Sequence, residues 1–262
     1  MVSCVEAPSA SKFQQITRIE FDSHQLDLAE LNSRFESATP QEIMSWAIAT
    51  VPNLVQMTSF SMLAITHMLY QELDARIPVI FLDTLHLFPE TLATAQKAQM
   101  LYGLDLHTYR VAANIEKFVE HYGERLWERD VNQFHHLTKV EPMKRALEDL
   151  QVHAWITGRR RDQSSTRQKM PILELDQDGR LKINPLANWT KKELWHYIFA
   201  QSVLYNPLHD QGYTSIGDQP LTTKVQPGED ERAGRWRGSF KTECGIHGNS
   251  EPIPKLQPIE LI

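Results

Sequence analysis

The stretch LVQMTSFSMLAITHMLYQELDARIPVIFLDT, residues 54–84, decides the fold. Residues 54–60 form a short apolar run typical of a buried strand, residues 61–73 have helical spacing, and residues 78–83 form a second apolar run. Parallel neighbours in a sheet need a crossover connection, which is usually a helix. The stretch therefore predicts one strand–helix–strand unit of a parallel sheet.

The same alternation extends to both sides of this unit. Upstream, Thr39 and Glu42 form a capping box with Pro40 at the first helical position, which predicts a helix through Ile48. Downstream, the expected helices are residues 88–102, 115–122, 140–150 and 190–202, and the expected strands are residues 104–111, 154–158, 173–176 and 181–186. This order predicts an α/β fold with an open, mostly parallel sheet and helices on both faces.

The chain divides into one domain and two tails. We interpret residues 1–15 as a mobile N-terminal tail and residues 16–205 as the α/β domain. From about residue 206 the periodicity gives way to glycine, proline and charge, so residues 206–262 are predicted to be a mobile C-terminal tail of the same domain. The tail carries enough chemistry, described below, to be functional.

Composition excludes several classes of protein. The chain of 262 residues has a net charge of −6, which argues against nucleic acid as a partner because phosphate backbones favour basic surfaces. It has no apolar run long enough to span a membrane. Its first residues lack the basic segment and apolar run of a secretory signal. We expect a soluble cytoplasmic protein with no membrane partner.

The cysteine count narrows the chemistry. The only two cysteines are Cys4, in the predicted N-terminal tail, and Cys244. Two thiols cannot hold an iron–sulfur cluster, which needs about four ligands, and we expect no metal. The chain also lacks a CxxC pair for an internal thiol relay. If Cys244 reacts, another molecule must regenerate it.

Polar residues follow three of the predicted strands. These are Thr58-Ser59, Asp83-Thr84 and the segment TGRRRDQSSTRQK, residues 157–169. Ligands of an open parallel sheet lie outside the carboxyl ends of its strands, and helix starts there favour anions. The hydroxyls could equally be helix caps, and the arginines a solvated basic loop. The position of the arginines at a strand end favours a phosphate or sulfate site.

The C-terminal tail holds a second group of cations beside Cys244. GEDERAGRW (228–236) contains Arg232 and Arg235, and KTECGIH (241–247) contains Cys244 and His247. Guanidinium groups bind tetrahedral anions, and cations near a thiol favour its thiolate form. The alternatives are a mobile charged tail and an ordinary surface histidine. Together the motifs indicate a reactive thiol that meets an anionic substrate.

Six segments, in order, resemble one family. IFLDTLHLFPET (80–91), KVEPM (139–143), TGRRRDQSSTR (157–167), NPLANWT (184–190), GEDERAGRW and KTECGIH are similar to segments of the phosphoadenylyl-sulfate reductases, thioredoxin-dependent enzymes of sulfate assimilation. The similarity runs from about Thr39 to His247 and is closest to the fungal enzymes. It implies an adenine-nucleotide α-hydrolase-like, nucleotide-binding domain and a C-terminal catalytic flap. It also implies a homodimer.

The resemblance also implies roles for particular residues. Cys244 would attack the sulfur of 3′-phosphoadenosine 5′-phosphosulfate, and reduced thioredoxin would release sulfite from the resulting S-sulfonate, with no bound cofactor. Catalysis would involve Cys244 and His247, and His247 would also help to hold the sulfate end of the substrate. The residues expected to bind substrate are Thr58, Ser59, Asp83, Thr84, Lys139, Gly158, Arg159, Arg160, Arg161, Gln163, Ser164, Arg167, Arg232 and Arg235. Arg160, Arg161, Arg167 and Lys169 are candidates for the 3′-phosphate, which cannot be assigned to one of them.

Two departures from the related enzymes bear on function. Sister adenylyl-sulfate reductases hold a four-iron cluster on cysteines, and this chain has Phe134, His135, Asp218 and Leu221 at the matching positions. Relatives also carry a longer, glycine-containing phosphate loop where this chain has residues 57–66 without glycine. Two alternatives therefore stay open. One is a cluster-free adenylyl-sulfate reductase, and the other is a nucleotide-binding protein whose turnover is impaired by the short loop.

Overall fold

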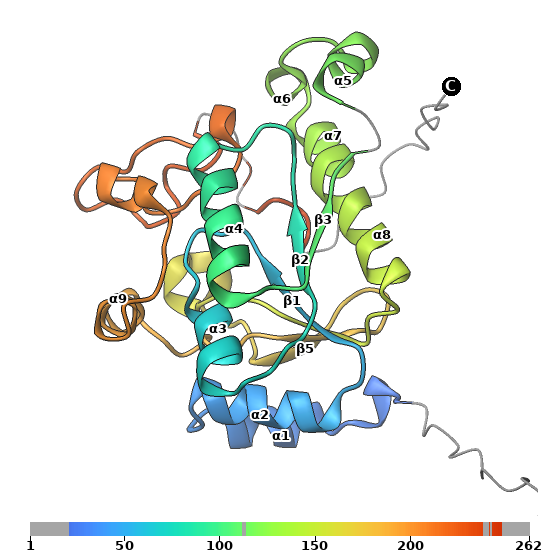
Figure 1. Cartoon of the computed structure of the whole chain (residues 1–262), viewed down its shortest axis with the longest axis vertical. Helices are drawn as coiled ribbons and strands as arrows, with labels where there is room; N and C mark the ends of the chain where they lie inside the picture. The colour runs from blue at the N-terminus through green and yellow to red at the C-terminus, as the bar shows by residue number, and fades with distance from the viewer. Residues whose placement is uncertain (1–20, 112–113, 238–240, 242, 248–262) are drawn as a thin grey trace, which may run out of the picture.

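The computed structural model describes residues 21–111, 114–237, 241 and 243–247, and its helices and strands alternate along most of the chain (Figure 1). The helices are α1 (Leu28–Phe35), α2 (Pro40–Thr50), α3 (Ala64–His67), α4 (Pro89–Tyr102), α5 (Ile115–Tyr122), α6 (Leu126–Arg129), α7 (Val131–His135), α8 (Glu141–Asp149) and α9 (Lys191–Ala200). The strands are β1 (Leu54–Thr58), β2 (Val79–Leu82), β3 (Leu106–Tyr109), β4 (Ala154–Ile156), β5 (Leu173–Leu175) and β6 (Leu181–Ile183).

The strands form one sheet in the order β3-β2-β1-β4-β6-β5. All neighbouring pairs are parallel except β5 and β6, which are antiparallel at one edge. The predicted open, mostly parallel sheet is therefore confirmed. The chain runs from β1 outward to β3 and then returns to place β4 on the other side of β1, so the strand order reverses between β1 and β4.

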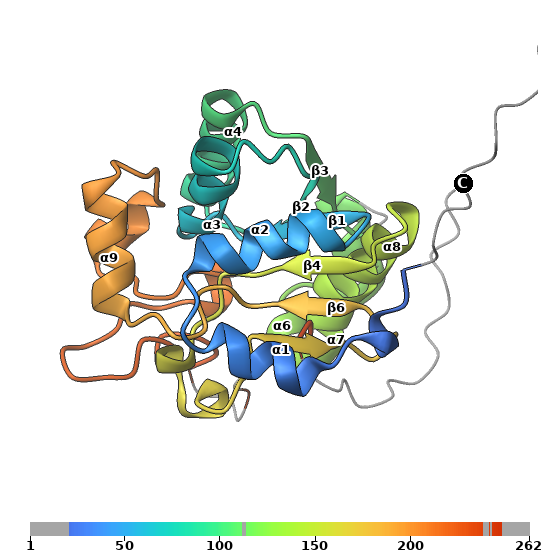
Figure 2. The same cartoon turned by 90° about the horizontal axis from the view of Figure 1, so that it is seen from below.

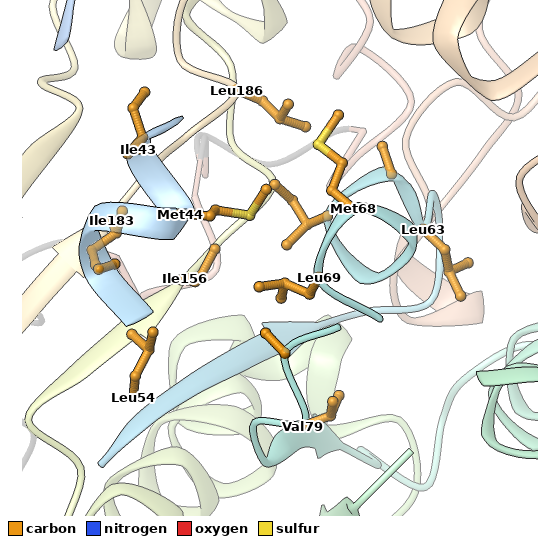
Figure 3. Packing of buried hydrophobic residues seen from close by; sticks show 14 of the residues in the cluster. Ile43, Met44, Leu54, Leu63, Met68, Leu69, Val79, Ile156, Ile183 and Leu186 are labelled. Atoms are coloured by element: carbon orange, nitrogen blue, oxygen red, sulfur yellow. The ribbon is translucent and has the colours of Figure 1, made fainter. Parts of the chain in front are cut away.

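Helices cover both faces of the sheet, as Figures 1 and 2 show. On one face, Val55 and Trp155 pack with Met143 and Leu147 of α8. On the other face, helices α1 to α4 and α9 contribute to the larger core, part of which Figure 3 shows around Met44. Burial on both faces explains why the strands have almost continuous apolar sequence instead of an alternating pattern.

The helical prediction was wrong in places where local signals are weak. Helices α1, α6 and α7 were not expected, and α8 is preceded directly by a π-helical segment, His136–Val140, that follows α7. Pro142 lies in the first turn of α8 and has no N–H to donate, which is why its position suggested a helix start. The helical path instead begins upstream of this proline, because the π-helical turn carries it past the missing donor.

The described part of the C-terminal tail packs against the sheet domain. Leu208 and Ile216 form a small apolar cluster with Phe88 at the start of α4. Asp218 forms an isolated antiparallel bridge with Leu87, and Trp236 is buried. The predicted N-terminal tail, residues 1–15, lies outside the described residues. Among the residues described, no helix combines the length and apolar character needed to cross a bilayer.

Candidate active site at the switch point of the sheet

A cavity of about 240 Å³ opens at the carboxyl ends of β1 and β4. Thr58 and Ser59 line it from the end of β1, and Thr157 and Gly158 line it from the end of β4. This is the point where the strand order reverses, and ligands of open α/β sheets bind in the crevice at such a switch point. The fold therefore places the candidate site where the strand-end residues predicted it.

The arginine loop after β4 lines the cavity and is held by carboxylates. Arg159 forms an ion pair with Glu174, and Arg160 donates to Glu231 of the C-terminal tail at 2.7 Å. The Gln163 side-chain oxygen accepts from the Arg160 backbone N–H at 3.1 Å. Arg160 is almost fully buried, so the Glu231 carboxylate offsets the cost of removing its charge from water.

The residue before Cys244 joins two further arginines. The Glu243 carboxylate accepts two hydrogen bonds from Arg167, both at 2.8 Å, and one from Arg232 at 3.1 Å. Arg167, Arg232 and Cys244 all line the cavity. Glu243 thus sits where guanidinium groups from the β4 loop and the C-terminal tail converge, and it brings the neighbouring thiol to the same cavity.

A buried polar cluster borders the cavity on the α7–α8 side. Lys139 Nζ lies 2.5 Å from the Asp218 carboxylate, and Trp236 Nε1 donates to His135 at 3.3 Å. The Arg235 guanidinium stacks on the Trp236 ring, 4.6 Å from its centroid. Lys139, Arg235 and Trp236 line the cavity. The C-terminal tail therefore carries two groups that face the same space as Lys139.

His247 packs against the sheet next to the cavity. Its ring stacks on Trp155 of β4, with 5.5 Å between centroids and 13° between planes, and its carbonyl accepts from Lys182 at 3.3 Å. Burial, followed by repulsion from Arg159, lowers the pKa of His247 well below its ordinary value. The imidazole is therefore neutral near pH 7, and its buried Nδ1 has no partner among the described residues. It can offer a ligand one hydrogen bond but no charge.

Positive charge remains after the internal ion pairs are made. Burial, and then repulsion from Arg167, lowers the pKa of Arg232 to about 10, so Arg232 stays charged at neutral pH. Burial also lowers the pKa of Arg235, whose Nε has no hydrogen-bond partner in the described structure. Both guanidinium groups interact electrostatically with Cys244. Four cations (Lys139, Arg167, Arg232 and Arg235) share two carboxylates, Asp218 and Glu243, which suits an anionic ligand.

Most of the sequence-predicted site residues meet in this cavity. Those that line it are Thr58, Ser59, Thr84, Lys139, Gly158, Arg159, Arg160, Gln163, Arg167, Arg232, Arg235, Cys244 and His247. They come from the ends of β1, β2 and β4, from the π-helical segment before α8, and from the C-terminal tail. Their roles in binding and catalysis stay predictions.

Three predicted residues do not line the cavity. Asp83 pairs with Arg110 at 3.1 Å, and the Ser164 hydroxyl lies 2.9 Å from that of Thr166. Arg161 donates to the Glu36 carboxylate at 2.7 Å, which ties the loop to the end of α1. A direct contact with substrate is therefore less direct to argue for these three than for their neighbours.

Carboxylate partners were missed by sequence reasoning. Glu231, Glu243 and Asp218 each bind a cavity cation, although each is distant in sequence from that cation. Only Glu243 gave a local signal, since it stands next to Cys244. The other two pairs arise from the way the C-terminal tail folds back over the strand ends.

The glycine-free loop after β1 is held by the C-terminal tail. Phe60 has a φ of 51°, in the left-handed region that favours glycine, and its ring packs edge-on against Phe81 with centroids 4.9 Å apart. The Ser61 hydroxyl lies 2.9 Å from His209 Nε2, and its carbonyl accepts from the Asn206 N–H at 3.0 Å. The short loop is thus fixed by packing and by residues 206–209 in a conformation that relatives reach with glycine.

Two buried histidines give the protein an expected acid sensitivity. Burial lowers the pKa of His135 and of His209 to about 4, so both are neutral in the folded protein at pH 6. In the unfolded chain each has its ordinary value near 6.5, and the unfolded chain therefore binds more protons between about pH 6.5 and 4. Stability rises with pH in that window and is lost as the pH falls through it.

We expect the free energy of unfolding to fall by about 2 kcal/mol per buried histidine between pH 7 and pH 5. Urea unfolding at several pH values measures the slope. His209→Gln should flatten the slope by roughly one proton, whereas His196→Gln, an exposed position on α9, should leave it unchanged. Equal slopes in the wild-type and His209→Gln proteins would contradict the assignment.

Comparison with known proteins identifies the class and then the family. The sheet and its cation-lined switch-point cavity are those of an adenine-nucleotide α-hydrolase-like protein, a fold shared with Candida glabrata FMN adenylyltransferase (TM-score 0.54, 12% identity, 87% of this chain and 78% of that one). Residues 53–224 match the phosphoadenosine phosphosulfate reductase domain. The chain belongs to the phosphoadenosine phosphosulfate reductase family.

Individual relatives agree with this assignment. The chain is 42% identical over 254 residues to a probable phosphoadenosine phosphosulfate reductase of Schizosaccharomyces pombe, covering 95% of this chain and 93% of that protein. It is similar to the crystal structure of Candida auris phosphoadenylyl-sulfate reductase in complex with phosphate (TM-score 0.69, 38% identity, 76% and 96% coverage). It is also 42% identical over 229 residues to an adenosine 5′-phosphosulfate reductase of Salinibacter ruber, covering 86% and 90%.

The four positions that match the cluster ligands of the sister enzymes lie together. His135 Nε2 is 3.3 Å from the Asp218 carboxylate, and Phe134 belongs to an apolar cluster against which Leu221 packs. None of the four supplies a thiolate, and the described residues contain no group of three or more histidine, cysteine or acidic side chains arranged to hold a metal ion. These side chains do not suit an iron–sulfur cluster.

Proposed function

We propose that the protein reduces 3′-phosphoadenosine 5′-phosphosulfate to sulfite and adenosine 3′,5′-bisphosphate, with Cys244 as the nucleophile. The observation that carries the proposal is that Cys244 lines the same switch-point cavity as Lys139, Arg232 and Arg235. A nucleotide with its phosphosulfate at these cations would present its sulfur to the thiol. The similarity to named phosphoadenosine phosphosulfate reductases over most of the chain supports this substrate.

The first step transfers a sulfonate group. The Cys244 thiolate attacks the sulfonate sulfur, a sulfur–sulfur bond forms, and the bond from that sulfur to the bridging phosphate oxygen breaks. The nucleotide leaves as adenosine 3′,5′-bisphosphate and keeps the oxygen. Lys139, Arg232 and Arg235 offset the negative charge of the sulfonate and of the leaving phosphate, which would otherwise repel a thiolate.

The second step needs an external dithiol. A thiolate of reduced thioredoxin attacks Cys244 and displaces sulfite, and the second thiol of thioredoxin then releases Cys244 as a free thiol. The substrate sulfur accepts two electrons, and the thioredoxin dithiol is oxidised to a disulfide. Cys244 is a free cysteine, and no second thiol belongs to the cavity, in agreement with an external reductant. This chemistry requires a reducing compartment, so we place the protein in the cytoplasm.

Two partners in turn require access to one thiol. We propose that the C-terminal tail closes over bound nucleotide and opens for thioredoxin. The contacts that support a closed state are Glu243 with Arg167 and His247 with Trp155, because both join the tail to the sheet domain. The family resemblance implies a homodimer, and light scattering measures that state directly.

Two alternatives have specific observations in their favour. The similarity to an adenosine 5′-phosphosulfate reductase, at the same identity as the fungal relative, leaves the unphosphorylated nucleotide as a candidate substrate. The glycine-free loop at Phe60 and Ser61 favours a protein that binds nucleotide but turns it over poorly.

Sulfite release separates these functions. We expect sulfite from 3′-phosphoadenosine 5′-phosphosulfate only when reduced thioredoxin is present, with kcat/KM at least about tenfold higher than for adenosine 5′-phosphosulfate, because one lost charge-assisted contact costs about that factor. The reverse order of rates would favour the unphosphorylated substrate. Calorimetry that detects tight binding of adenosine 3′,5′-bisphosphate, without sulfite from either substrate, would favour the binding protein.

A further inference from the structure

Asp218 is a fully buried acid beside the cavity. Its Oδ2 lies 2.5 Å from Lys139 Nζ and 3.3 Å from His135 Nε2, and its Oδ1 has no partner among the described residues. Its own backbone is fixed, because its carbonyl accepts from Thr222 at 2.8 Å and it forms a bridge with Leu87. The carboxylate is therefore held rigidly at one edge of the cavity.

The charge on Asp218 is sustained by Lys139. Burial alone would raise the pKa of Asp218, but the Lys139 ammonium and the contact with His135 hold it well below its ordinary value. His135 is itself neutral near pH 7, because burial lowers its pKa to about 4. A buried carboxylate is costly to ionise unless a cation compensates it. The Asp218–Lys139 contact is thus an ion pair, to which His135 adds a neutral group.

Lys139 gains its direction from the same contact. It lies in the π-helical segment His136–Val140, and π turns inside helices often mark functional positions because they redirect side chains. A lysine ammonium has three donors on a flexible stem, so a single fixed acceptor decides where the other two point. Lys139 lines the cavity while Asp218 does not. The remaining donors are available to a ligand in the cavity.

We propose that Asp218 is a positioning residue that holds the Lys139 ammonium toward the sulfonate of the substrate. The inference rests on the proposed function for the identity of the group that Lys139 meets. It also gives a role to one position that matches a cluster ligand in the sister enzymes. There this chain carries an anion of its own, bound to a lysine that lines the cavity.

Asp218→Asn tests the proposal because it keeps the shape of the side chain and removes its charge. We expect kcat/KM for 3′-phosphoadenosine 5′-phosphosulfate to fall about 10- to 100-fold, the effect of losing a charge-assisted hydrogen bond that places a group. The affinity for adenosine 3′,5′-bisphosphate, which lacks the sulfonate, should stay within about twofold in calorimetry. A parallel loss of affinity for this product would show a general structural role and overturn the proposal.

A double-mutant cycle separates positioning from stability. In a Lys139→Met background, Asp218→Asn should cause no further loss of kcat/KM, because the group it positions is gone. His135→Gln contacts the same carboxylate without removing the ion pair, so it should lower thermal stability but leave kcat/KM within about threefold of wild type. Additive losses in the double variant, or unchanged kcat/KM in Asp218→Asn, would overturn the proposal.

The outcome also distinguishes this inference from the proposed function. A wild-type protein that releases no sulfite from either nucleotide refutes the proposed reaction before any variant is compared. An active wild type with an additive cycle refutes the role of Asp218 and leaves the reaction intact.

Discussion

Cys244→Ser is expected to abolish sulfite release while leaving nucleotide binding intact. The serine hydroxyl at this position has the shape of the thiol but is a far weaker nucleophile, and the neutral His247 beside it is stacked on Trp155. Loss of an enzymatic nucleophile costs roughly 100,000-fold or more in turnover. Because the thiol is only one of many cavity-lining groups, the affinity for adenosine 3′,5′-bisphosphate should change by less than about threefold.

The measurement has two arms. Sulfite release with reduced thioredoxin gives the loss of turnover, and mass spectrometry of the wild-type protein after a single turnover without thioredoxin should find one SO₃ group on Cys244. Cys4→Ser is the matched control and should behave as wild type, since Cys4 lies in the predicted N-terminal tail. Sulfite production by Cys244→Ser at a rate comparable with wild type, or an unmodified Cys244 after substrate has been consumed, would refute the mechanism.

The sheet could be predicted from sequence because its strands are buried on both faces. Continuous apolar runs such as residues 78–83 have no other simple explanation at that length, and each observed strand lies within a predicted one. The polar residues that end these runs, Thr58 and Thr157 among them, meet in the cavity because parallel strands end at the same edge. Local sequence thus carried both the layers of the fold and the place of the site.

The electrostatic arrangement of the site could not be predicted in the same way. Arg160 with Glu231, Arg167 with Glu243, and Lys139 with Asp218 are 71, 76 and 79 positions apart in the chain. Such pairs depend on how the C-terminal tail crosses the strand ends, and no spacing rule reports that path.

Sequence also cannot show how the glycine-free loop is accommodated. At Phe60 a positive φ replaces an expected glycine, and contacts with Phe81 and the C-terminal tail hold this conformation. Both come from distant parts of the chain, so the backbone conformation of this loop follows from tertiary packing.

Arg235→Gln is expected to lower kcat/KM about 100- to 1,000-fold, the usual cost of removing a preorganised donor to a developing anion. Arg235 lines the cavity, its guanidinium lies over Trp236, and its buried Nε has no partner in the described structure. Arg237, two positions along the same tail, is exposed and pairs with Glu229 at 2.8 Å. Arg237→Gln is therefore the matched control and should retain activity within about twofold, as an exposed ion pair contributes little.

Gly217→Ala tests the same position without changing the arginine. A Cβ on Gly217 would lie 2.0 Å from Arg235 Nη2, so the guanidinium must move for the methyl group to fit. We expect Gly217→Ala to lower kcat/KM about tenfold or more in the wild-type background, since displacement of a donor by 1 Å is costly. In Arg235→Gln it should have little further effect, because the shorter side chain leaves the space open. Steady-state kinetics of the four proteins checks this: if Gly217→Ala costs as much without the guanidinium as with it, the glycine acts on the backbone, and the position of Arg235 is not what the catalytic rate depends on.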